Sequence, residues 1–412
     1  MKSIIYITIF LLAFTVNAQE TIKTMFYNVL EFPYANPANR SLILRDILDE
    51  YEPDIFMICE LQGEAGAEEI LTVSLNYQNN TYSRAEYISN QSSGSDLQQM
   101  IYFKTDKFSL ETSEVIITDV RDINRYQLKL NTVDQGSDPV FLDLYVTHLK
   151  SSQGSDNQNL RLGMVTELTT FLESVDPDSY VIFAGDFNLY TSTEPAYIEL
   201  LDETNAIVMV DPINTLGSWH NNEDFQDIHT QSTRISSGPF GAGAGGGLDD
   251  RFDFITMSKN MESDPKMHYL EDTYKSFGNN GNCYNESINN ENCTGVYSQE
   301  IRENLYNMSD HLPVIMELET NKEFILSIPD FDINKVISVE NTLVNNQLIL
   351  SVSEEFSENI NFTIYNSLGQ KVLQYSSENE NIIIINVSFL QSGLFYIKTN
   401  FPNEEVLKFI KK

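Results

Sequence analysis

The chain has 412 residues and a formal net charge of −35, from 60 acidic and 25 basic residues. That length exceeds what one hydrophobic core usually fills, so we expect two domains. A protein that holds a polyanion by counterion release needs a basic surface, and this composition argues against one. A substrate that carries phosphates must therefore be held by bound cations and a few local arginines.

Residues 1–18 have the pattern of a secretory signal peptide. Lys2 precedes an apolar run over residues 4–14, and small residues end the segment at Val16-Asn17-Ala18. The run is too short to span a membrane as a helix. We expect cleavage before Gln19, no other membrane-spanning segment, and a mature protein that is secreted or attached to the cell surface.

Residues 19–320 alternate between expected strands and helices. Apolar runs predict strands, and apolar residues at helical spacing predict helices. The expected strands cover residues 24–27, 55–59, 100–103, 126–130, 141–147, 180–184, 252–255 and 314–318. The expected helices cover residues 41–51, 67–75 and 159–173. Strands flanked by helices predict a layered α/β architecture.

The cysteines fit an exported protein. Cys283 and Cys293 lie in a polar, asparagine-rich loop over residues 278–297, which has little apolar material to order it. A disulfide between them would close a short loop and stabilise it. Cys59 lies in an apolar run and is expected to be a buried free thiol. No cysteine spacing suggests a zinc site.

Polar residues stand at matching ends of the expected strands. Those that follow an apolar run are Asn28, Glu60, His148, Asp186 and Asn188. Those at or just before the start of a strand are Asp253, Ser309, Asp310 and His311. Antiparallel neighbours would bring the second group to the same rim as the first. The segment after Ala184 is by itself also typical of a turn, but the joint pattern predicts one cleft lined by polar groups.

These residues stand in a recognisable set of motifs. The motifs are Asn28, Glu60, Thr147-His148, Gly185-Asp186-Phe187-Asn188, Arg251-Phe252-Asp253-Phe254-Ile255 and Ser309-Asp310-His311-Leu312-Pro313. Their order resembles that of the endonuclease/exonuclease/phosphatase (DNase I-like) superfamily over residues 20–320. The resemblance implies a four-layer α/β sandwich, in which two mixed sheets lie face to face with helices outside.

The same resemblance implies a metal centre. Glu60 would hold a divalent cation, normally Mg²⁺, with Asn28 and Asp310 beside it; Mn²⁺ and Ca²⁺ are alternatives. Asp186 would align and activate the attacking water, and Asn188 would steady the phosphate.

The resemblance also implies roles for two histidines. His311 would pair with Asp253 and, as a cation, stabilise the pentavalent transition state. His148 would contact the phosphate or protonate the leaving oxygen. Pancreatic-type deoxyribonucleases support the equivalent histidine with a glutamate, and the matching strand here has Asp96 and no glutamate. The acid role of His148 is therefore left open.

Two arginines are candidates for binding substrate phosphate. Arg125 stands at the start of an expected strand, and its alternative is an ordinary surface salt bridge. Arg234 ends the segment over residues 228–234, which lies where family members place a substrate-facing strand. The glycine-rich residues 238–247 follow and lack the Gly-Lys-Ser/Thr of a Walker loop. We expect them to form either a mobile lid near the cleft or a plain flexible loop.

A linker over residues 321–333 leads to a C-terminal domain over residues 334–412. Strands are expected at residues 347–352, 361–365, 370–373, 381–387, 394–398 and 406–410, which predicts a small β-sandwich. Residues 362–372, 392–398 and 408–412 resemble the type IX secretion C-terminal sorting domain of Bacteroidota. That resemblance implies the type IX secretion machinery as a partner. The alternative is a generic carbohydrate- or protein-binding sandwich.

The expected function is that of a secreted, metal-dependent phosphodiesterase, a monomeric nuclease acting on extracellular nucleic acid. A phospholipid phosphodiesterase of the sphingomyelinase type and a phosphomonoesterase are alternatives on the same fold. No aromatic hairpin suited to entering a bilayer is evident, which argues against the lipid substrate. A non-catalytic surface binding protein is the third alternative, and the complete set of site residues argues against it.

Overall fold

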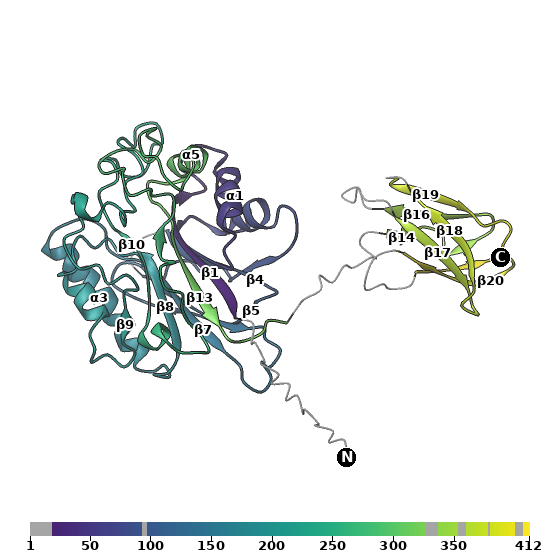
Figure 1. Cartoon of the computed structure of the whole chain (residues 1–412), viewed down its shortest axis with the longest axis horizontal. Coiled ribbons are helices and arrows are strands. Elements are labelled where there is room, and N and C mark those ends of the chain that lie inside the picture. The colour runs from purple at the N-terminus through teal and green to yellow at the C-terminus, as the bar shows by residue number, and fades with distance from the viewer. Residues whose placement is uncertain (1–18, 93–96, 326–336, 353–359, 378–379, 400–406) are drawn as a thin grey trace, which may run out of the picture. The chain divides into compact units, whose positions relative to one another are not determined.

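The apolar runs of the first 320 residues form two mixed β-sheets that pack face to face (Figure 1). The computed structural model describes residues 19–92, 97–325, 337–352, 360–377, 380–399 and 407–412. The expected signal peptide, Asp96 and the part of the expected linker after residue 325 lie outside these ranges. The chain divides into two compact units, residues 1–325 and residues 326–412.

The first sheet has the strand order β11-β13-β1-β2-β4-β3, and β12 also pairs with β13. Its strands are β1 (Glu20–Phe32), β2 (Ile55–Leu61), β3 (Tyr82–Arg84), β4 (Gln98–Lys104), β11 (His268–Tyr269), β12 (Lys275–Ser276) and β13 (Val314–Thr320). β1 is parallel to β2 and antiparallel to β13. The ends of β1 and β2 therefore meet the start of β13 at one edge of the sheet.

The second sheet has the strand order β5-β6-β7-β8-β10-β9. Its strands are β5 (Phe108–Ile116), β6 (Ile123–Leu130), β7 (Phe141–His148), β8 (Tyr180–Asp186), β9 (Met209–Val210) and β10 (Asp253–Ser258). β8 is parallel to β7 and antiparallel to β10. In this register both His148 and Asp253 stand directly opposite Asp186, so all three residues lie at the same end of the sheet, where their strands end or begin.

Helices cover the outer faces of both sheets. They are α1 (Arg40–Tyr51), α2 (Glu64–Glu69) with its continuation η1 (Ile70–Leu75), α3 (Ser155–Leu172), α4 (Pro195–Leu200), η2 (Glu223–Phe225), η3 (Lys259–Glu262) and α5 (Gln299–Met308). Leu44, Ile47 and Leu48 of α1 pack in the same apolar cluster as the first sheet. Val165 and Leu168 of α3 pack with the second sheet. The expected four-layer α/β sandwich is thus confirmed.

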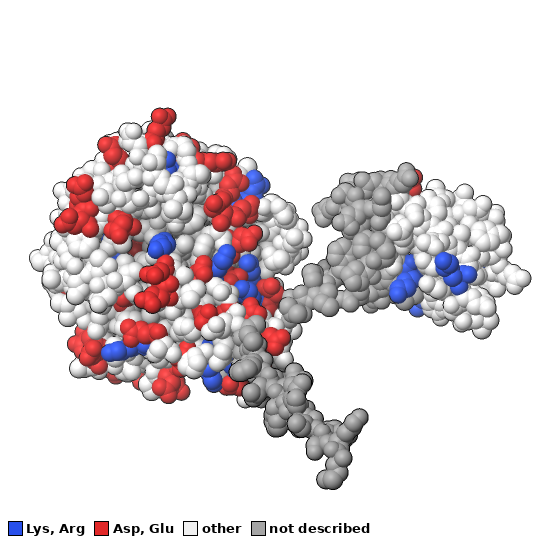
Figure 2. Space-filling view, in the orientation of Figure 1, with Lys and Arg blue, Asp and Glu red and all other residues white. Residues whose placement is uncertain are grey.

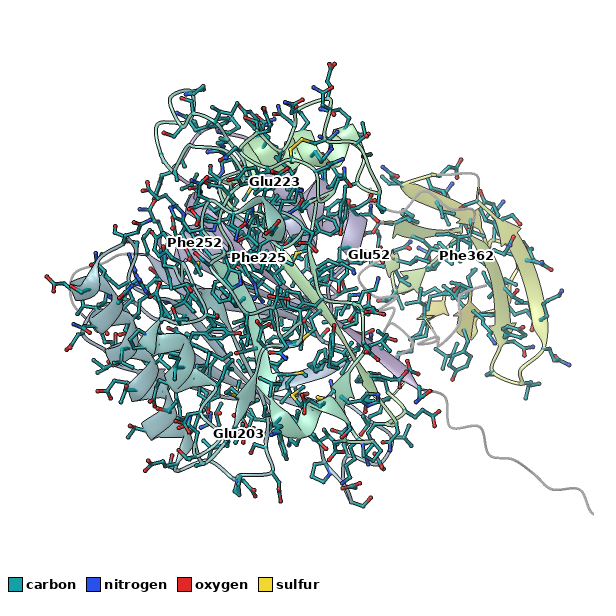
Figure 3. All side chains as sticks on the ribbon, turned by 60° about the vertical axis from the view of Figure 1, so that its left-hand side comes forward. Glu52, Glu203, Glu223, Phe225, Phe252 and Phe362 are labelled. Atoms are coloured by element: carbon teal, nitrogen blue, oxygen red, sulfur yellow. A yellow bond between two sulfur atoms is a disulfide. The ribbon has the colours of Figure 1, made fainter. Side chains whose placement is uncertain are left out.

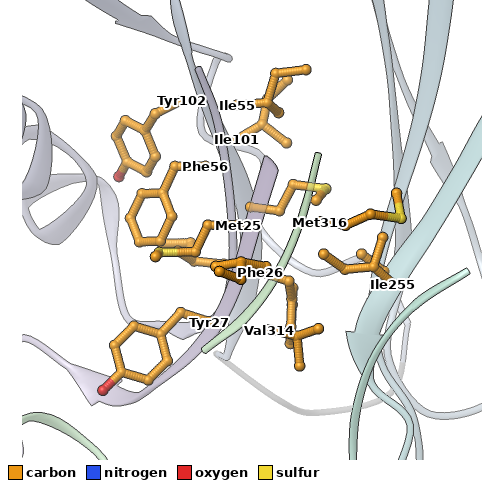
Figure 4. Packing of buried hydrophobic residues seen from close by; sticks show 14 of the residues in the cluster. Met25, Phe26, Tyr27, Ile55, Phe56, Ile101, Tyr102, Ile255, Val314 and Met316 are labelled. Atoms are coloured by element: carbon orange, nitrogen blue, oxygen red, sulfur yellow. The ribbon is translucent and has the colours of Figure 1, made fainter. Parts of the chain in front are cut away.

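Large apolar side chains fill the interior of unit 1 (Figure 3). Phe56 and Tyr102 lie on one side of the first sheet, and Met316 lies on the other side near Ile255 of the second sheet (Figure 4). Burial of such side chains contributes about 1.5–3 kcal/mol each and holds the two sheets together. No helix among the described residues is long and apolar enough to cross a membrane.

Several elements of the fold, including β5 and α5, were not predicted from the sequence. β5 lies at the edge of its sheet and keeps most of its side chains partly or fully exposed, so it lacks the apolar run that marks a buried strand. α5 is a short helix that begins where the Ser298 side chain accepts a hydrogen bond from the Ile301 amide. Its last residue directly precedes Ser309, so α5 anchors the chain that leads into the site.

Unit 2 consists of strands, as expected. They are β14 (Ile337–Val339), β15 (Leu343–Val344), β16 (Gln347–Val352), β17 (Asn361–Asn366), β18 (Lys371–Ser376), β19 (Ile382–Asn386), β20 (Gly393–Lys398) and β21 (Leu407–Lys411). They form a sheet in the order β14-β16-β19 and a second in the order β15-β21-β20-β17-β18. Alternate side chains of both sheets, such as Leu350, Phe362 and Phe395, pack into one apolar core.

Candidate active site

The polar residues expected at the strand ends converge at one rim of unit 1. The first sheet supplies Asn28, Glu60, Asp310 and His311, and the second supplies His148, Asp186, Asn188 and Asp253. The side chains of Glu60 and Asp186 come from opposite sheets, and both accept hydrogen bonds from the Asn28 amide. The site therefore exists only because the two sheets face each other.

Asn28 organises the carboxylates through its amide nitrogen. Its Nδ2 donates to Glu60 Oε1 at 2.9 Å and to Asp186 Oδ2 at 3.1 Å. Its Oδ1 accepts from the backbone amide of Leu30 at 3.0 Å and so faces away from the carboxylates. The structure places Asn28 beside Glu60, as expected, and in this arrangement its nitrogen orients the two carboxylates. Its role as a metal ligand stays a prediction.

Glu60 sits on a backbone that ordinary residues rarely adopt. It has φ 61°, and Glu31, whose amide donates to Glu60 Oε2 at 3.2 Å, has φ 45°. Left-handed conformations of this kind cost about 1–3 kcal/mol at non-glycine residues and are concentrated at functional sites. Burial, and then the nearby charge of Asp310, raise the pKa of Glu60. A cation would relieve both effects.

Asp310 has one oxygen engaged and one free of hydrogen bonds. Its Oδ2 accepts from the Ala244 amide at 2.6 Å, and the Gln231 amide lies 3.2 Å away. Its Oδ1 is buried and has no hydrogen-bond partner. An orphaned carboxylate oxygen fits a hard divalent cation, which prefers such ligands, and the charge of Asp310 raises the pKa of Glu60. Oxygen or nitrogen atoms of Glu60, His148 and Asp186 also lie within 4.8 Å of one another, close enough to hold one ion.

Asp186 lies at the centre of the site. Burial raises the pKa of Asp186, the charge of His311 lowers it, and the charges of Asp253 and Glu60 raise it again, so the net shift is upward. A carboxylate with a raised pKa accepts a proton more readily, as a base that activates water must.

His311 and Asp253 form a buried pair. His311 Nδ1 lies 2.7 Å from Asp253 Oδ2, and Asp253 is completely buried. Burial lowers the pKa of His311, but the charges of Asp253, Asp186 and Asp310 outweigh burial and raise that pKa well above its ordinary value. The amide nitrogen of Gln231, 2.6 Å from His311 Nε2, would suit the neutral ring instead. The Asn28 amide nitrogen also lies 3.4 Å from His311 Nε2, but the charges of three buried carboxylates outweigh these two amides and favour the charged form of His311.

The surroundings of His148 shift its pKa in the other direction. Its Nε2 lies 3.5 Å from Asp186 Oδ2, and its buried Nδ1 has no hydrogen-bond partner. Burial, and then the positive charges of Arg121 and His311, lower the pKa of His148 well below its ordinary value. These effects favour the neutral form of His148, which suits a contact with the phosphate better than donation of a proton as an acid.

The segment after β8 folds as its sequence requires. A Cβ on Gly185 would lie 2.4 Å from the backbone oxygen of Thr147, so only glycine fits against β7 there. Phe187 points to the outer face and stacks on Phe254, with ring centroids 5.0 Å apart. Asn188 has φ 51°, and its backbone amide donates to Asp186 Oδ1 at 3.1 Å. The turn thus fixes the orientation of the Asp186 carboxylate.

Arg125 does not reach the site. β6 begins at Ile123 rather than after Arg125, so Arg125 lies within the strand. It pairs with Glu114 and Asp143 at 2.7 Å each and packs over Tyr145, on the face of the sheet opposite to His148. Its expected role in substrate binding is corrected, because the site lies on the other face.

Arg234 is completely buried, which also corrects its expected role. Its Nε donates to the backbone oxygen of Tyr306 at 2.9 Å, and its guanidinium lies 3.5 Å from the centre of the Phe240 ring. It anchors the chain behind the site, and a substrate phosphate in solvent has no access to it.

The basic residues beside the site are Arg121 and Lys150, which the sequence analysis missed. Arg121 Nη1 donates to the backbone oxygens of His148 and Leu149, and its buried Nε has no hydrogen-bond partner. Lys150 follows two residues after His148 and is partly exposed. A signal was available, because Arg121 precedes the strand that pairs with the end of β7.

Cys283 and Cys293 form a disulfide, and Cys59 is a buried free thiol. The bridge spans a sequence separation of 10 residues. In the chain-entropy account, closing a loop of this length stabilises the fold by about 2–3 kcal/mol.

We therefore expect the double variant Cys283→Ser, Cys293→Ser to lose about 2–3 kcal/mol of unfolding free energy. Urea denaturation of the double variant beside the wild-type protein measures this, and the reduced wild type is the control. An unchanged unfolding free energy would mean that hydrogen bonds of the loop, such as that from Asn280 Nδ2 to the backbone oxygen of Cys293, suffice to hold it.

The C-terminal segment matches a known family. Residues 344–412 fit the family model described as the secretion system C-terminal sorting domain, in agreement with the resemblance seen in the sequence. No curated protein sequence matches the chain.

Several solved structures are similar in fold. TDP2 from D. rerio, complexed with a single strand DNA product, is 17% identical with a TM-score of 0.47, over 73% of this chain and 99% of that chain. The human Nocturnin catalytic domain with a bound sulfate anion is 15% identical with a TM-score of 0.43, over 72% and 94%. An endonuclease/exonuclease/phosphatase family protein from Bacteroides thetaiotaomicron is 17% identical with a TM-score of 0.44, over 75% and 100%.

Proposed function

We propose that this protein is a secreted, divalent-metal-dependent phosphodiesterase that hydrolyses extracellular nucleic acid. One observation carries the proposal: buried carboxylates from two sheets meet two histidines at one rim, where the pKa of His311 is raised and the pKa of His148 is lowered. Phosphoryl transfer needs a cation for the phosphate, a base for the water and positive charge where the transition state becomes negative. This set of side chains supplies or attracts each of them.

Glu60 and Asp310 would hold the cation, and their oxygens suit Mg²⁺, with Mn²⁺ or Ca²⁺ as alternatives. A bound divalent cation withdraws charge from a phosphoryl oxygen. Asp186 would align the attacking water and take its proton, helped by its raised pKa. Asn188 would steady the phosphate next to it.

His311 would face the non-bridging oxygens, where negative charge grows during attack. Asp253 holds the ring of His311 by its Nδ1 and keeps it charged, 2.7 Å away and out of reach of substrate. His148, whose neutral form is favoured, would donate a hydrogen bond to the phosphate. The roles of the two histidines therefore differ because their environments differ.

Arg121 and Lys150 favour a substrate with phosphates beside the one that is cleaved. They are the basic residues next to His148, and a phosphodiester chain would extend past the cleaved bond toward such cations. The large apolar side chains exposed on unit 1 come from separate elements, such as Tyr34, Ile198 and Leu216, and do not form one hairpin for entering a bilayer among the described residues. Both points favour nucleic acid over a phospholipid.

We propose export through the type IX secretion machinery. The match of residues 344–412 to a secretion sorting domain supports this route, and a cleaved signal peptide over residues 1–18 would take the chain across the first membrane. The proposed exported chain comprises the catalytic domain over residues 19–320, the linker over residues 321–333 and the sorting domain over residues 334–412, which would be cleaved from the mature enzyme. It would act as a monomer, secreted or at the cell surface.

The decisive experiment is an assay of the purified protein against DNA, RNA, sphingomyelin and a phosphomonoester. We expect hydrolysis of nucleic acid with Mg²⁺, loss of activity with EDTA and recovery when metal is restored. Asp186→Asn is the control for contaminating nuclease and should be inactive. Hydrolysis of sphingomyelin or the phosphomonoester alone would replace the substrate class, and no hydrolysis at all would favour a binding protein.

We expect the activity on nucleic acid to depend weakly on salt. Acidic side chains dominate the face of unit 1 seen in Figure 2, with few basic ones between them. Each neutralised phosphate contributes about −0.9 to the slope of log affinity against log salt on duplex DNA. With Arg121 and Lys150 as the contacts, the slope of log kcat/KM should be no steeper than about −2. Titration with KCl at fixed Mg²⁺ measures it, and a slope near −5 would indicate a basic groove.

A further inference from the structure

The glycine-rich residues of the loop after Arg234 are ordered by contacts with the site. Residues 231–235 pair loosely with residues 246–250, through bonds such as those from the Ser232 amide to the Gly247 oxygen and from the Gly247 amide to the Arg234 oxygen. The Thr233 amide also donates to the backbone oxygen of Asp310. We name residues 241–244, which have the sequence Gly-Ala-Gly-Ala, the Gly-Ala segment.

The Gly-Ala segment ends on Asp310. The Ala244 amide donates to Asp310 Oδ2 at 2.6 Å, and the Ser232 hydroxyl donates to the Ala244 backbone oxygen at 3.1 Å. Both peptide groups that flank the Ala244 Cα are thus engaged, one with the site and one with the loop that carries it. The Ala244 amide therefore holds a fixed direction toward the carboxylate.

Gly243 makes this contact possible. It has φ 84°, and a Cβ there would lie 2.9 Å from Asp310 Cγ and 3.1 Å from Leu30 Cδ2. Any side chain would push the segment and the carboxylate apart. Gly241 has a similar φ of 72°, but the nearest atom to its Cβ position is Asn36 Nδ2 at 3.9 Å. The two glycines thus have similar positive φ angles, and of the two only Gly243 has its Cβ position against the site.

We propose that Gly243 and Ala244 position Asp310 for binding the divalent cation. The Ala244 amide occupies Oδ2, so that Oδ1, which is buried and has no hydrogen-bond partner, becomes the oxygen presented to the metal. A hydrogen bond to one oxygen of a ligating carboxylate fixes its rotation and saves the ordering cost on binding. The inference rests on the proposed function, because that function supplies the cation. It assigns the Gly-Ala segment a positioning role in place of a mobile lid.

The test is calorimetric titration of the full-length protein with Mn²⁺ and with Mg²⁺, which reads metal affinity without substrate. We expect Gly243→Ala to raise the Kd for the metal about tenfold or more, in the range seen when partners of metal ligands are removed. Gly241→Ala, the matched control, adds the same methyl group at a similar positive φ, where the nearest atom is Asn36 Nδ2 at 3.9 Å, and should stay within about twofold of the wild type.

A second pair of variants removes the donor itself. Ala244→Pro deletes the amide that binds Asp310, and Ala242→Pro deletes the equivalent amide one repeat earlier. We expect a weaker metal affinity for the first and little change for the second. Thermal unfolding without metal checks that each variant is folded, so that the second pair decides the matter if Gly243→Ala does not fold.

The outcomes separate this inference from the proposed function. Equal metal affinity of Gly243→Ala, Ala244→Pro and the wild type would overturn the positioning role and leave the function intact. Equal losses in the two members of each pair would overturn it too, since the effect would then come from the loop backbone. A wild type that binds metal but hydrolyses nothing would overturn the function and leave the positioning role standing. A wild type without metal binding would overturn both.

Discussion

Replacing His311 or Asp253 by alanine lowers kcat/KM by about a hundredfold or more, and replacing both lowers it little further. This is the result we expect for the largest single contribution to catalysis. The imidazolium meets the negative charge that develops on the non-bridging phosphoryl oxygens, and Asp253, at 2.7 Å from Nδ1, keeps the ring oriented and charged. Loss of either residue removes the same function, so the losses should not add.

The double-mutant cycle measures this on kcat/KM with His311→Ala, Asp253→Ala and the pair, at saturating metal. Circular dichroism and thermal unfolding of each variant serve as controls for folding. Fully additive losses would mean that the two residues act independently, and the pair would have to be abandoned.

The same pair predicts a change in the pH profile. In the folded protein the pKa of His311 is raised, so its charge contributes stability that is fully present below pH 6.5 and is lost as the pH rises through the raised pKa. In Asp253→Asn the largest raising charge is gone while burial, which lowers the pKa, remains. The descending limb of kcat/KM should move to lower pH. An unmoved limb would mean that another group sets it.

The second large effect concerns Glu60. In Glu60→Gln we expect the Mg²⁺ concentration for half-maximal activity to rise by about tenfold or more, because the site loses a negative charge that attracts the cation. Without metal the variant should be no less stable than the wild type. Burial and the charge of Asp310 raise the pKa of Glu60, which means that the charged carboxylate is unfavourable there until a cation binds.

The control is Glu64→Gln, which removes the same charge four residues after Glu60. The Glu64 side chain is 69% exposed. Activity titrations with Mg²⁺ should place Glu64→Gln with the wild type. Equal half-saturation in Glu60→Gln and the wild type would show that Glu60 does not hold the metal. A large fall in thermal stability without metal would instead assign Glu60 a structural role.

Much of the candidate site could be predicted from the sequence pattern. Asn28, Glu60, His148 and Asp186 follow apolar runs. β7 and β8 end at His148 and Asp186, whereas β1 and β2 continue past Asn28 and Glu60 to Phe32 and Leu61. Asp253 precedes its strand, and the antiparallel pairing of β10 with β8 sets it opposite Asp186. Strand ends can be predicted from the sequence because an apolar run marks the buried part of a strand. The polar residue that ends the run then lies at the rim.

The places of single residues within strands were harder to predict from the sequence. β6 begins three residues before the expected strand, and this shift moves Arg125 to the outer face and leaves Arg121 at the rim. The polar residues of β6 partly mask its apolar alternation, so that its start could not be fixed from local pattern. Arg234 is polar and yet completely buried, because backbone oxygens and the Phe240 ring from other parts of the chain surround it.

By itself the sequence determined the two-part organisation, the strand ends that form the rim, and the residue types that meet there, since these follow from local periodicity and composition. Only the tertiary structure decided which atom each side chain presents. The side-chain nitrogen of Asn28 faces the carboxylates, and the Ala244 amide of the Gly-Ala segment donates to Asp310. The pKa of His148 is lowered while the pKa of His311 is raised. These features depend on contacts between segments far apart in the chain, where desolvation and the charges of neighbours act through space and leave no local pattern.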